Sequence, residues 1–195
     1  MELLRTPRLL LRNWEESDLP AFFDIYSRDE VSRWLGAAPR RPLASTGEAR
    51  ERLGRWRAHE AGLARPLGLW AIVPLDPAGP EPQPGGPGGP DGPAGPAGPV
   101  GTLLLLPLTD AGGPTGLVEV GWHLHPLYQG QGLATEAARA VLAAAAEAGI
   151  EPVLAVTDLD NVASQAVATR LGMHDDGITD RWFGLTMRQY RHPAP

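Results

Sequence analysis

The sequence of 195 residues contains no cysteine. Disulfide bonds, a thiol nucleophile and a cysteine-ligated metal are therefore excluded. Its apolar runs are short and interrupted by charge, so no segment is long enough to span a bilayer as a helix. The opening MELLRTPRLLLR carries arginines within its apolar run and lacks a small-residue cleavage site, unlike a signal peptide. We therefore expect a cytoplasmic protein without a membrane partner.

A surplus of positive charge is also absent, because the net charge is -6. This balance argues against a broad attraction to nucleic acid. It leaves open the local binding of a phosphorylated ligand, since backbone amides bind phosphate without any net positive charge. Hydrophobic residues make up 43% of the chain and charged residues 21%, values that are typical of a globular domain.

One segment departs from this composition. At residues 75–99 most positions are Gly or Pro, and glycine recurs at every third position from Gly86 to Gly101. Such a segment buries too little apolar surface to offset its ordering entropy, so we expect a disordered insertion. A collagen-like structure is disfavoured because the triplet run is short. Strand patterns on both sides indicate that the insertion interrupts one domain spanning residues 1–195.

The apolar patterns predict a mixed α/β domain with a β-α-β crossover in its second half. Strands are expected at residues 8–14, 67–73, 100–106, 117–125 and 152–157, and two more within 173–190. Helices are expected at residues 17–26, 45–62, 132–148 and 161–171. In the alanine-rich third helix, the stripe expected to face the core is Leu133, Ala137, Val141, Ala144 and Ala148.

The stretch HLHPLYQGQGLATEAARA places a glycine-containing loop between a strand and this helix. Amides at the start of a helix lack intrahelical partners, and the helix dipole adds partial positive charge there. Gly130 and Gly132 would let the backbone approach a bulky anion closely. The pattern therefore indicates a phosphate or pyrophosphate site, although a tight turn onto a packed helix would use the same glycines.

The same stretch resembles a known family. Gln129, Gly132 and Ala134 match the Gln/Arg-x-x-Gly-x-Gly/Ala signature of GNAT acyltransferases. Downstream, NVASQAVATRLGM is similar to the second motif of that superfamily, with Asn161 and Ser164 in its Asn-x-x-Ser form. The opening TPRLLLRNWEESDLPAFFDIY resembles the branch that contains the ribosomal-protein alanine N-acetyltransferases. Only the Gly/Pro-rich insertion departs from the resemblance.

This resemblance implies the α+β GNAT fold, with a mixed, mostly antiparallel twisted sheet of about seven strands, four helices and a splayed central strand pair. It implies acetyl-CoA as the acyl donor, no metal, and direct transfer to a primary amine. The acceptor would be a protein N-terminus or a small-molecule amine such as an antibiotic or polyamine. The oligomeric state stays open, a homodimer included.

The resemblance also assigns residues to the donor. The main chain at Leu124 and His125 would pair with the pantetheine arm, and the amide near Leu124 would polarise the thioester carbonyl. Asn161 would hydrogen-bond the arm, a role compatible with an ordinary helix N-cap. The amides that would hold the pyrophosphate belong to Gln129, Gly130, Gln131, Gly132, Leu133, Ala134 and Thr135.

Three residues are candidates for the chemistry. Strand alternation places Glu119 and His123 on one face. Because the attacking amine must be neutral, a carboxylate that accepts a proton helps, which makes Glu119 the first candidate base and His123 the second. Many family members use a tyrosine to protonate the leaving thiolate, but that position is Ala168 here. Ser164 is the substitute candidate, directly or through a water molecule.

Two other functions stay as alternatives. Gly130, Gly132 and Thr135 partly match the fingerprint of a dinucleotide-binding oxidoreductase, although the third position should be Gly or Ala. The missing tyrosine fits a non-catalytic CoA-binding module that keeps the fold. His123 and His125 share a strand face as two metal ligands would, but no third ligand stands at a characteristic spacing.

Deleting Asp76 to Pro99 tests whether the insertion is passive. We expect the free energy of unfolding to change by less than about 1 kcal/mol, because loop-closure entropy varies slowly with loop length. Coenzyme A affinity should also be nearly unchanged. Thermal unfolding and a coenzyme A titration of both chains provide the measurement, and a large drop in melting temperature would contradict the expectation.

Overall fold

A computed structural model describes residues 4–36, 40–75 and 98–193. The insertion predicted at residues 75–99 lies almost entirely outside these ranges. Within them, the strands are β1 (Leu4–Arg5), β2 (Leu9–Asn13), β3 (Gly68–Pro74), β4 (Gly101–Asp110), β5 (Gly113–Leu124), β6 (Val153–Asp158), β7 (His174–Thr179) and β8 (Met187–Arg191). They form one sheet in the order β1-β2-β3-β4-β5-β6-β8-β7. All neighbours are antiparallel except the parallel pair β5 and β6.

The described helices are α1 (Leu19–Tyr26), α2 (Asp29–Ser32), α3 (Thr46–Ala61), α4 (Leu133–Glu147) and α5 (Val162–Arg170), with single 3-10 turns at Glu16–Asp18 (η1) and Pro126–Tyr128 (η2). Four of the five correspond to the predicted helices, and the fold class is confirmed. The predicted N-cap of α3 is present, because Ser45 Oγ accepts the Glu48 N–H at 3.2 Å. Strand β1 is an addition that the sequence pattern did not indicate. No described helix is long and apolar enough to cross a membrane.

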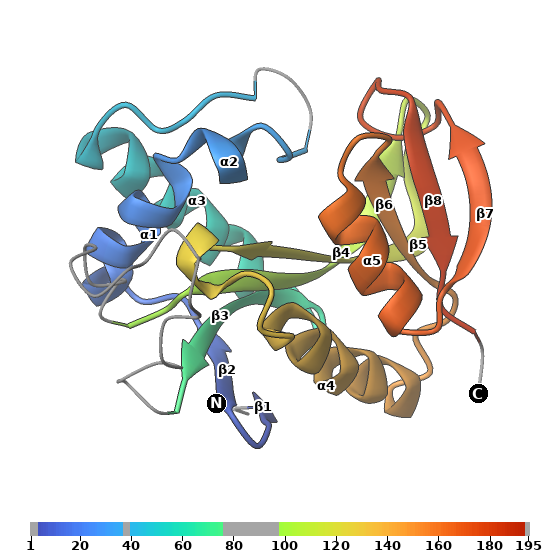
Figure 1. The fold of residues 1–195 in the computed structure, drawn as a ribbon, viewed down its shortest axis with the longest axis horizontal. Helices are drawn as coiled ribbons and strands as arrows, with labels where there is room; N and C mark the ends of the chain where they lie inside the picture. Colours follow the sequence, from blue (N-terminus) through green and yellow to red (C-terminus); the bar gives the residue numbers. More distant parts are fainter. Residues whose placement is uncertain (1–3, 37–39, 76–97, 194–195) are drawn as a thin grey trace.

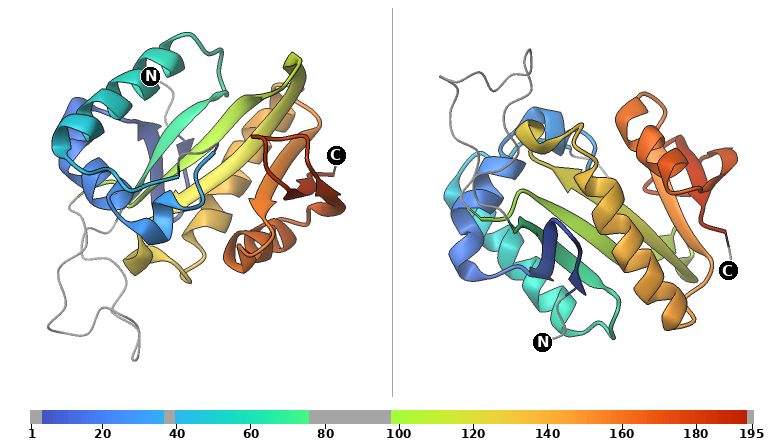
Figure 2. Two further views of the ribbon diagram at one scale, coloured as in Figure 1. Left: turned by 90° about the horizontal axis from the view of Figure 1, so that it is seen from above. Right: turned by 60° about the horizontal axis from the view of Figure 1, so that its bottom comes forward.

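The helices lie on both faces of the sheet (Figures 1 and 2). Helices α4 and α5 cover one face, where Val141 and Val167 belong to a buried cluster with residues of β2 to β6. Helices α1 and α3 cover the other face, where Phe22 and Leu53 pack in a second cluster. Alternate residues of β3 enter the two clusters, Ile72 the first and Ala71 the second. The central strands are therefore buried from both sides.

The buried face of α4 differs from the predicted stripe. Ala148 is exposed, whereas Ala138, Leu142 and Ala145 are buried together with the predicted Leu133, Ala137 and Val141. Because about half of the residues of this helix are alanine, the apolar pattern alone does not mark one face. The packing of α4 against the sheet decides which alanines are covered.

Strands β5 and β6 pair only at Val118 with Val153 and at Glu119 with Leu154. Beyond these two pairs the strands diverge, and Figure 1 shows β6, β8, β7 and α5 standing apart from the left-hand part of the sheet. From Val120 to Leu124, β5 therefore lacks a strand partner on its β6 side among the described residues. The predicted splayed central pair is confirmed.

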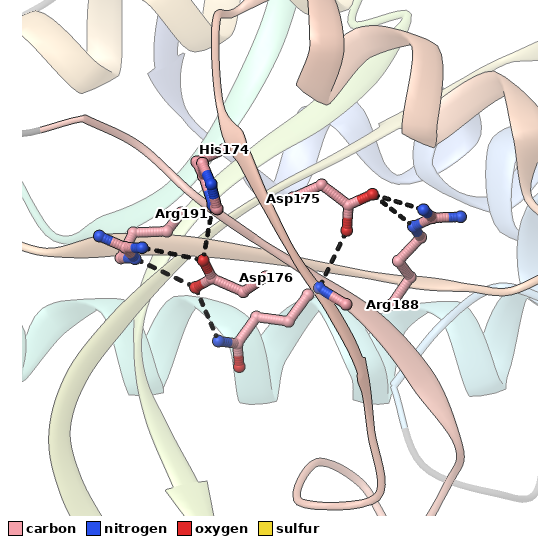
Figure 3. A network of polar contacts seen from close by, with 7 residues as sticks. His174, Asp175, Asp176, Arg188 and Arg191 are labelled. Carbon is pink, nitrogen blue, oxygen red and sulfur yellow. Dashed lines mark hydrogen bonds and ion pairs between the residues drawn. The ribbon is translucent and has the colours of Figure 1, made fainter.

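Ion pairs join the edge strand β7 to its neighbour β8. Strand β7 is an exposed edge strand, and Figure 3 shows its acidic residues facing the arginines of β8. Asp175 pairs with Arg188, and Asp176 accepts Arg191 Nη2 at 2.9 Å. The Arg191 guanidinium holds the pKa of Asp176 below its usual range. Charged pairs along an edge strand disfavour the addition of another strand.

Candidate active site

The loop before α4 presents a run of main-chain N–H groups. The Gln129 N–H donates to Pro126 O at 3.2 Å, and the Glu136 N–H donates to Gly132 O at 3.0 Å. Between them, the amides of residues 130–135 donate to no acceptor in the described parts of the chain. Gly130 and Gly132 have φ values of 76° and 78°, a left-handed conformation that glycine adopts without strain. The amides of residues 130–135, here called the amide cradle, are thus a run of unengaged donors at the start of α4, where a helix end favours anions.

Two glutamine side chains fix this loop from within. Gln129 Nε2 donates to Leu124 O at 3.0 Å, and Gln131 Nε2 donates to Leu127 O at 2.9 Å. The resemblance included the main-chain N–H of Gln129 in the pyrophosphate site, but this N–H donates to Pro126 O. The Gln129 side chain instead stabilises the loop through its bond to Leu124 O. These two bonds brace the loop that carries the amide cradle.

The N-terminal segment fixes the loop from outside. Glu136, in the first turn of α4, accepts Thr6 Oγ1 at 2.6 Å and Arg8 Nε at 2.6 Å. Arg8 Nη1 also donates to Gln131 O at 3.1 Å. Burial would raise the pKa of Glu136, but the hydrogen bonds from Thr6 and Arg8 outweigh it and hold the pKa below its usual range. Glu136 is therefore an ionised, neutralised anchor beside the amide cradle.

The main chain of β5 offers hydrogen-bonding groups to the opening between β5 and β6. The His125 N–H donates to Val100 O at 2.8 Å, so by alternation His123 and His125 direct their main-chain groups toward β4. The alternate residues Val120, Trp122 and Leu124 direct theirs into the opening. The Leu124 main-chain N–H therefore has no strand partner in the described ranges, whereas the His125 N–H is already engaged with Val100.

A cavity of about 300 Å³, here called the α4 cavity, lies between the amide cradle, the end of β5 and the start of α5. Asn161 lines it and caps α5, because its Oδ1 accepts the Ser164 N–H at 3.1 Å. The N-cap role considered for Asn161 is therefore present. The side chain still faces the cavity.

A second cavity of about 510 Å³, here called the α3 cavity, lies between α3, β5 and the end of β6. It contains Glu119 and several residues of α3 and of the preceding loop. The two cavities share Trp34, Trp122, His123, Asn161 and Ser164. The two cavities therefore meet beside the last residues of β5, at a point here called the junction.

Glu119 lies in the α3 cavity, half-buried on β5. In the described parts of the chain it forms neither an ion pair nor a side-chain hydrogen bond. Burial without a compensating charge raises its pKa to about 7. A carboxyl group with this pKa can both accept and release a proton near neutral pH, as a general base must.

His123 lies on the same face, as strand alternation predicted, but its environment differs. Its Nδ1 is 3.2 Å from the hydroxyl of Tyr26, which also bonds Thr102 Oγ1 at 2.6 Å. Burial, together with the positive charge of Arg52, lowers the pKa of His123 to about 4. The imidazole is therefore neutral at pH 7 and a weaker base than Glu119. Tyr26 comes from α1, and no motif in the sequence indicated its place in this network.

His125 is buried and, like His123, contacts α1, at Asp24 rather than at Tyr26. Its Nδ1 accepts the Leu127 N–H at 3.2 Å, which starts η2, and its Nε2 lies 3.3 Å from Asp24 Oδ2. Burial, with Arg28 nearby, lowers its pKa despite Asp24. Among the described residues no cluster of three or more His, Cys, Asp or Glu side chains could hold a metal ion.

Ser164 is half-buried and lines both cavities. Ala168, one turn later, is fully buried in the core against α4. The position at which many family members carry the tyrosine therefore does not face the cavities. Of the candidates from the sequence, Ser164 is the hydroxyl that the structure brings to the junction.

Sequence reasoning missed the wall of the α3 cavity that faces Glu119. It is formed by Arg40 before α3 and by Arg52, Arg55, Trp56 and His59 of α3. The α3 residues stand at i, i+3, i+4 and i+7, a spacing that places them on one helix face. The spacing in the sequence predicts a shared helix face, but it does not predict that this face lines a cavity with Glu119.

Comparison with known proteins places this site in a family. The Acetyltransferase (GNAT) domain profile matches residues 8–174, so the chain belongs to the GNAT acetyltransferases. An acetyltransferase from Agrobacterium tumefaciens is 25% identical, with 99% of this chain and 95% of that chain covered and a TM-score of 0.65. The dinucleotide-binding alternative is therefore wrong, because that fold requires a mostly parallel sheet and only one strand pair here is parallel.

Two further structures share the fold at lower identity. A Salmonella typhimurium acetyltransferase that modifies the N-terminal serine of the 50S ribosomal subunit protein L7/L12 is 18% identical, with 97% and 98% of the chains covered and a TM-score of 0.68. RimL, a ribosomal L7/L12 alpha-N-protein acetyltransferase solved with coenzyme A, is 19% identical, with 97% of each chain covered and a TM-score of 0.70. The resemblance to ribosomal-protein N-acetyltransferases is confirmed in fold, although the Salmonella protein modifies serine rather than alanine.

The raised pKa of Glu119 predicts a pH-dependent gain in stability for Glu119→Gln. Below about pH 4.5 the carboxyl group is protonated in both the folded and unfolded states, so variant and parent should unfold alike. Above about pH 7 the parent folds with a buried charge, and the variant should be more stable by roughly 2–3 kcal/mol. Denaturant unfolding across this pH range measures the difference. A variant that is equally or less stable above pH 7 would contradict the environment described for Glu119.

Proposed function

We propose that this chain transfers an acetyl group from acetyl-CoA directly to a primary amine. The observation that carries the proposal is the junction of the two cavities, one holding the amide cradle and the other an unneutralised carboxyl group with a pKa of about 7. Two ligands that meet at this junction react without a covalent enzyme intermediate. Family membership supports the reaction class.

The α4 cavity suits the donor. The amide cradle would bind the diphosphate of acetyl-CoA, because successive N–H groups at a helix start favour anions. Arg170 lines the cavity beside it and could pair with a further phosphate group of the nucleotide. The pantetheine arm would follow β5 in the opening, with Leu124 N–H donating to the thioester carbonyl. RimL, which has the same fold, binds coenzyme A.

The chemical step follows from the residues at the junction. The amine nitrogen forms a bond to the acetyl carbon while the carbon–sulfur bond breaks. Glu119 accepts the amine proton, directly or through a water molecule. Leu124 N–H stabilises the negative charge that develops on the carbonyl oxygen. Ser164, or a water molecule bound beside it, returns a proton to the thiolate, and neutral His123 orients the acceptor.

The acceptor is a protein N-terminus or a small-molecule amine. The Salmonella protein that shares the fold modifies an N-terminal serine, which supports the first class. A non-catalytic coenzyme A-binding module is the second candidate, and the core position of Ala168 favours it because no tyrosine among the described residues lines either cavity. Glu119 argues against the non-catalytic module, because a buried carboxyl group with a raised pKa lowers stability and only catalysis would benefit from it.

Substituting Gly132 tests the donor site. Gly132→Leu should weaken coenzyme A binding by about tenfold or more, since a side chain there obstructs the approach of the diphosphate and strains the loop. Gly149→Leu is the matched control, because Gly149 has a φ of 68° just beyond the other end of α4. Isothermal titration with coenzyme A compares both variants with the parent. Equal affinity of Gly132→Leu and the parent would rule out the amide cradle as the diphosphate site.

Acetyl transfer to a mixed panel of peptides and small amines tests the reaction itself, with detection by mass spectrometry. Because the chain contains no lysine, acetylation of the enzyme is confined to its own N-terminus. The turnover rate should rise with pH through about 7 as Glu119 loses its proton, and Glu119→Gln should lower it about 100-fold or more. Glu51→Gln, an exposed acid on α3, is the control. Tight coenzyme A binding with no transfer to any amine would support the non-catalytic module.

A further inference from the structure

The α3 cavity is positively charged in a protein that is negative overall. The net charge of the chain is -6, yet the arginines Arg40, Arg41, Arg52 and Arg55 line this cavity against two acidic residues, Glu119 and Asp158. In the whole chain the acidic residues outnumber the basic ones, 23 to 17. The accumulation of arginine therefore points to a ligand.

Two of these arginines have their charge neutralised already. Arg40 Nη1 lies 2.6 Å from Asp158 Oδ1, and Arg41 Nη1 lies 3.0 Å from Glu48 Oε2. Arg52 and Arg55 form no ion pair and no side-chain hydrogen bond in the described parts of the chain. Both project from the same face of α3 as Trp56 and His59. The unneutralised charge of the cavity is thus concentrated on this helix face.

Arg52 is the more buried of the two and lies close to the junction. Its charge is felt at His123 and Tyr26, which form the hydrogen-bonded network beside Glu119. Burial lowers the pKa of Arg52, Tyr26 and Glu48 oppose that shift, and its cationic form has no ion-pair partner among the described residues. An anion bound there would supply that partner.

We propose that the acceptor amine carries an anionic group, a carboxylate or a phosphate, which Arg52 and Arg55 bind while the amine faces Glu119. This inference rests on the proposed function, and it specifies the acceptor class. Polyamines and other polycationic amines are disfavoured, because the cavity would repel them. The anion can belong to a small amine or to acidic side chains that follow a peptide N-terminus.

Equilibrium binding to the full chain loaded with coenzyme A tests the inference separately from catalysis. One arm compares peptides of equal length that share an N-terminal serine followed by three aspartates, three asparagines or three arginines. The other arm compares O-phosphoethanolamine with ethanolamine. In at least one arm the anionic probe should bind about tenfold more tightly than its neutral counterpart, with a preference that declines as salt rises. The arm that shows the preference identifies the source of the anion.

Variants assign the preference to residues. Arg52→Gln or Arg55→Gln should lower the affinity for the anionic probe about fivefold, and Arg55→Glu should favour the arginine peptide. Arg57→Gln removes the same charge from α3 outside the cavity and should have no effect. Thermal unfolding checks that Arg52→Gln folds, and the exposed Arg55 provides the test if it does not.

Three outcomes would overturn the inference. These are no binding by either anionic probe, equal binding of charged and neutral probes, and an equal loss in Arg57→Gln. Acetylation of neutral or basic amines in the transfer assay would then leave the proposed function standing without its acceptor class. Absence of transfer alongside anion binding would instead remove the proposed function and keep the anion site.

Discussion

The two-residue pairing of β5 with β6 is the constraint on which the rest of the structure depends. A longer parallel ladder would satisfy the main chain of β5 through Leu124 and close the opening between the strands. Because the ladder ends at Glu119, both cavities exist, and the last residues of β5 separate them. One strand therefore supplies main-chain groups to one cavity and the Glu119 side chain to the other. The chemistry proposed for this chain is a consequence of sheet geometry before it is a consequence of any single side chain.

The amide cradle shows how the proposed anion site keeps its donors exposed in the structure. Its donors could satisfy themselves by continuing α4 backward by a turn, but the left-handed Gly130 and Gly132 prevent this. The side chains of Gln129 and Gln131 bond carbonyl groups of the preceding segment, so the loop does not collapse onto its own amides. The cost of leaving these donors without protein partners is small while water reaches them, and ordering entropy need not be spent again when an anion binds.

Much of this architecture was readable from the sequence because local signals determine it. The Ser45 N-cap, the alternation along β5 and the glycines before α4 each specify a local conformation, and all three occur where they were predicted. The features that could not be predicted depend on packing between residues that are distant in sequence. The contact of Tyr26 with His123 joins residues 97 apart in sequence, and the buried face of α4 depends on which alanines meet the sheet. The arginine face of α3 was visible as a periodicity, but only the docking of α3 beside β5 turned it into part of a cavity.

The contact of Glu136 with the N-terminal segment has a consequence for the charge of the proposed donor site. A carboxylate in the first turn of α4 would on its own repel a diphosphate arriving at the same helix end. Thr6 and Arg8, more than a hundred positions earlier, occupy both of its oxygens and act as an internal counterion. A chain stripped of its first hairpin would keep every amide of the cradle yet present bare negative charge to the nucleotide. The order of the strands thus neutralises Glu136, because it brings the beginning of the chain to the first turn of α4.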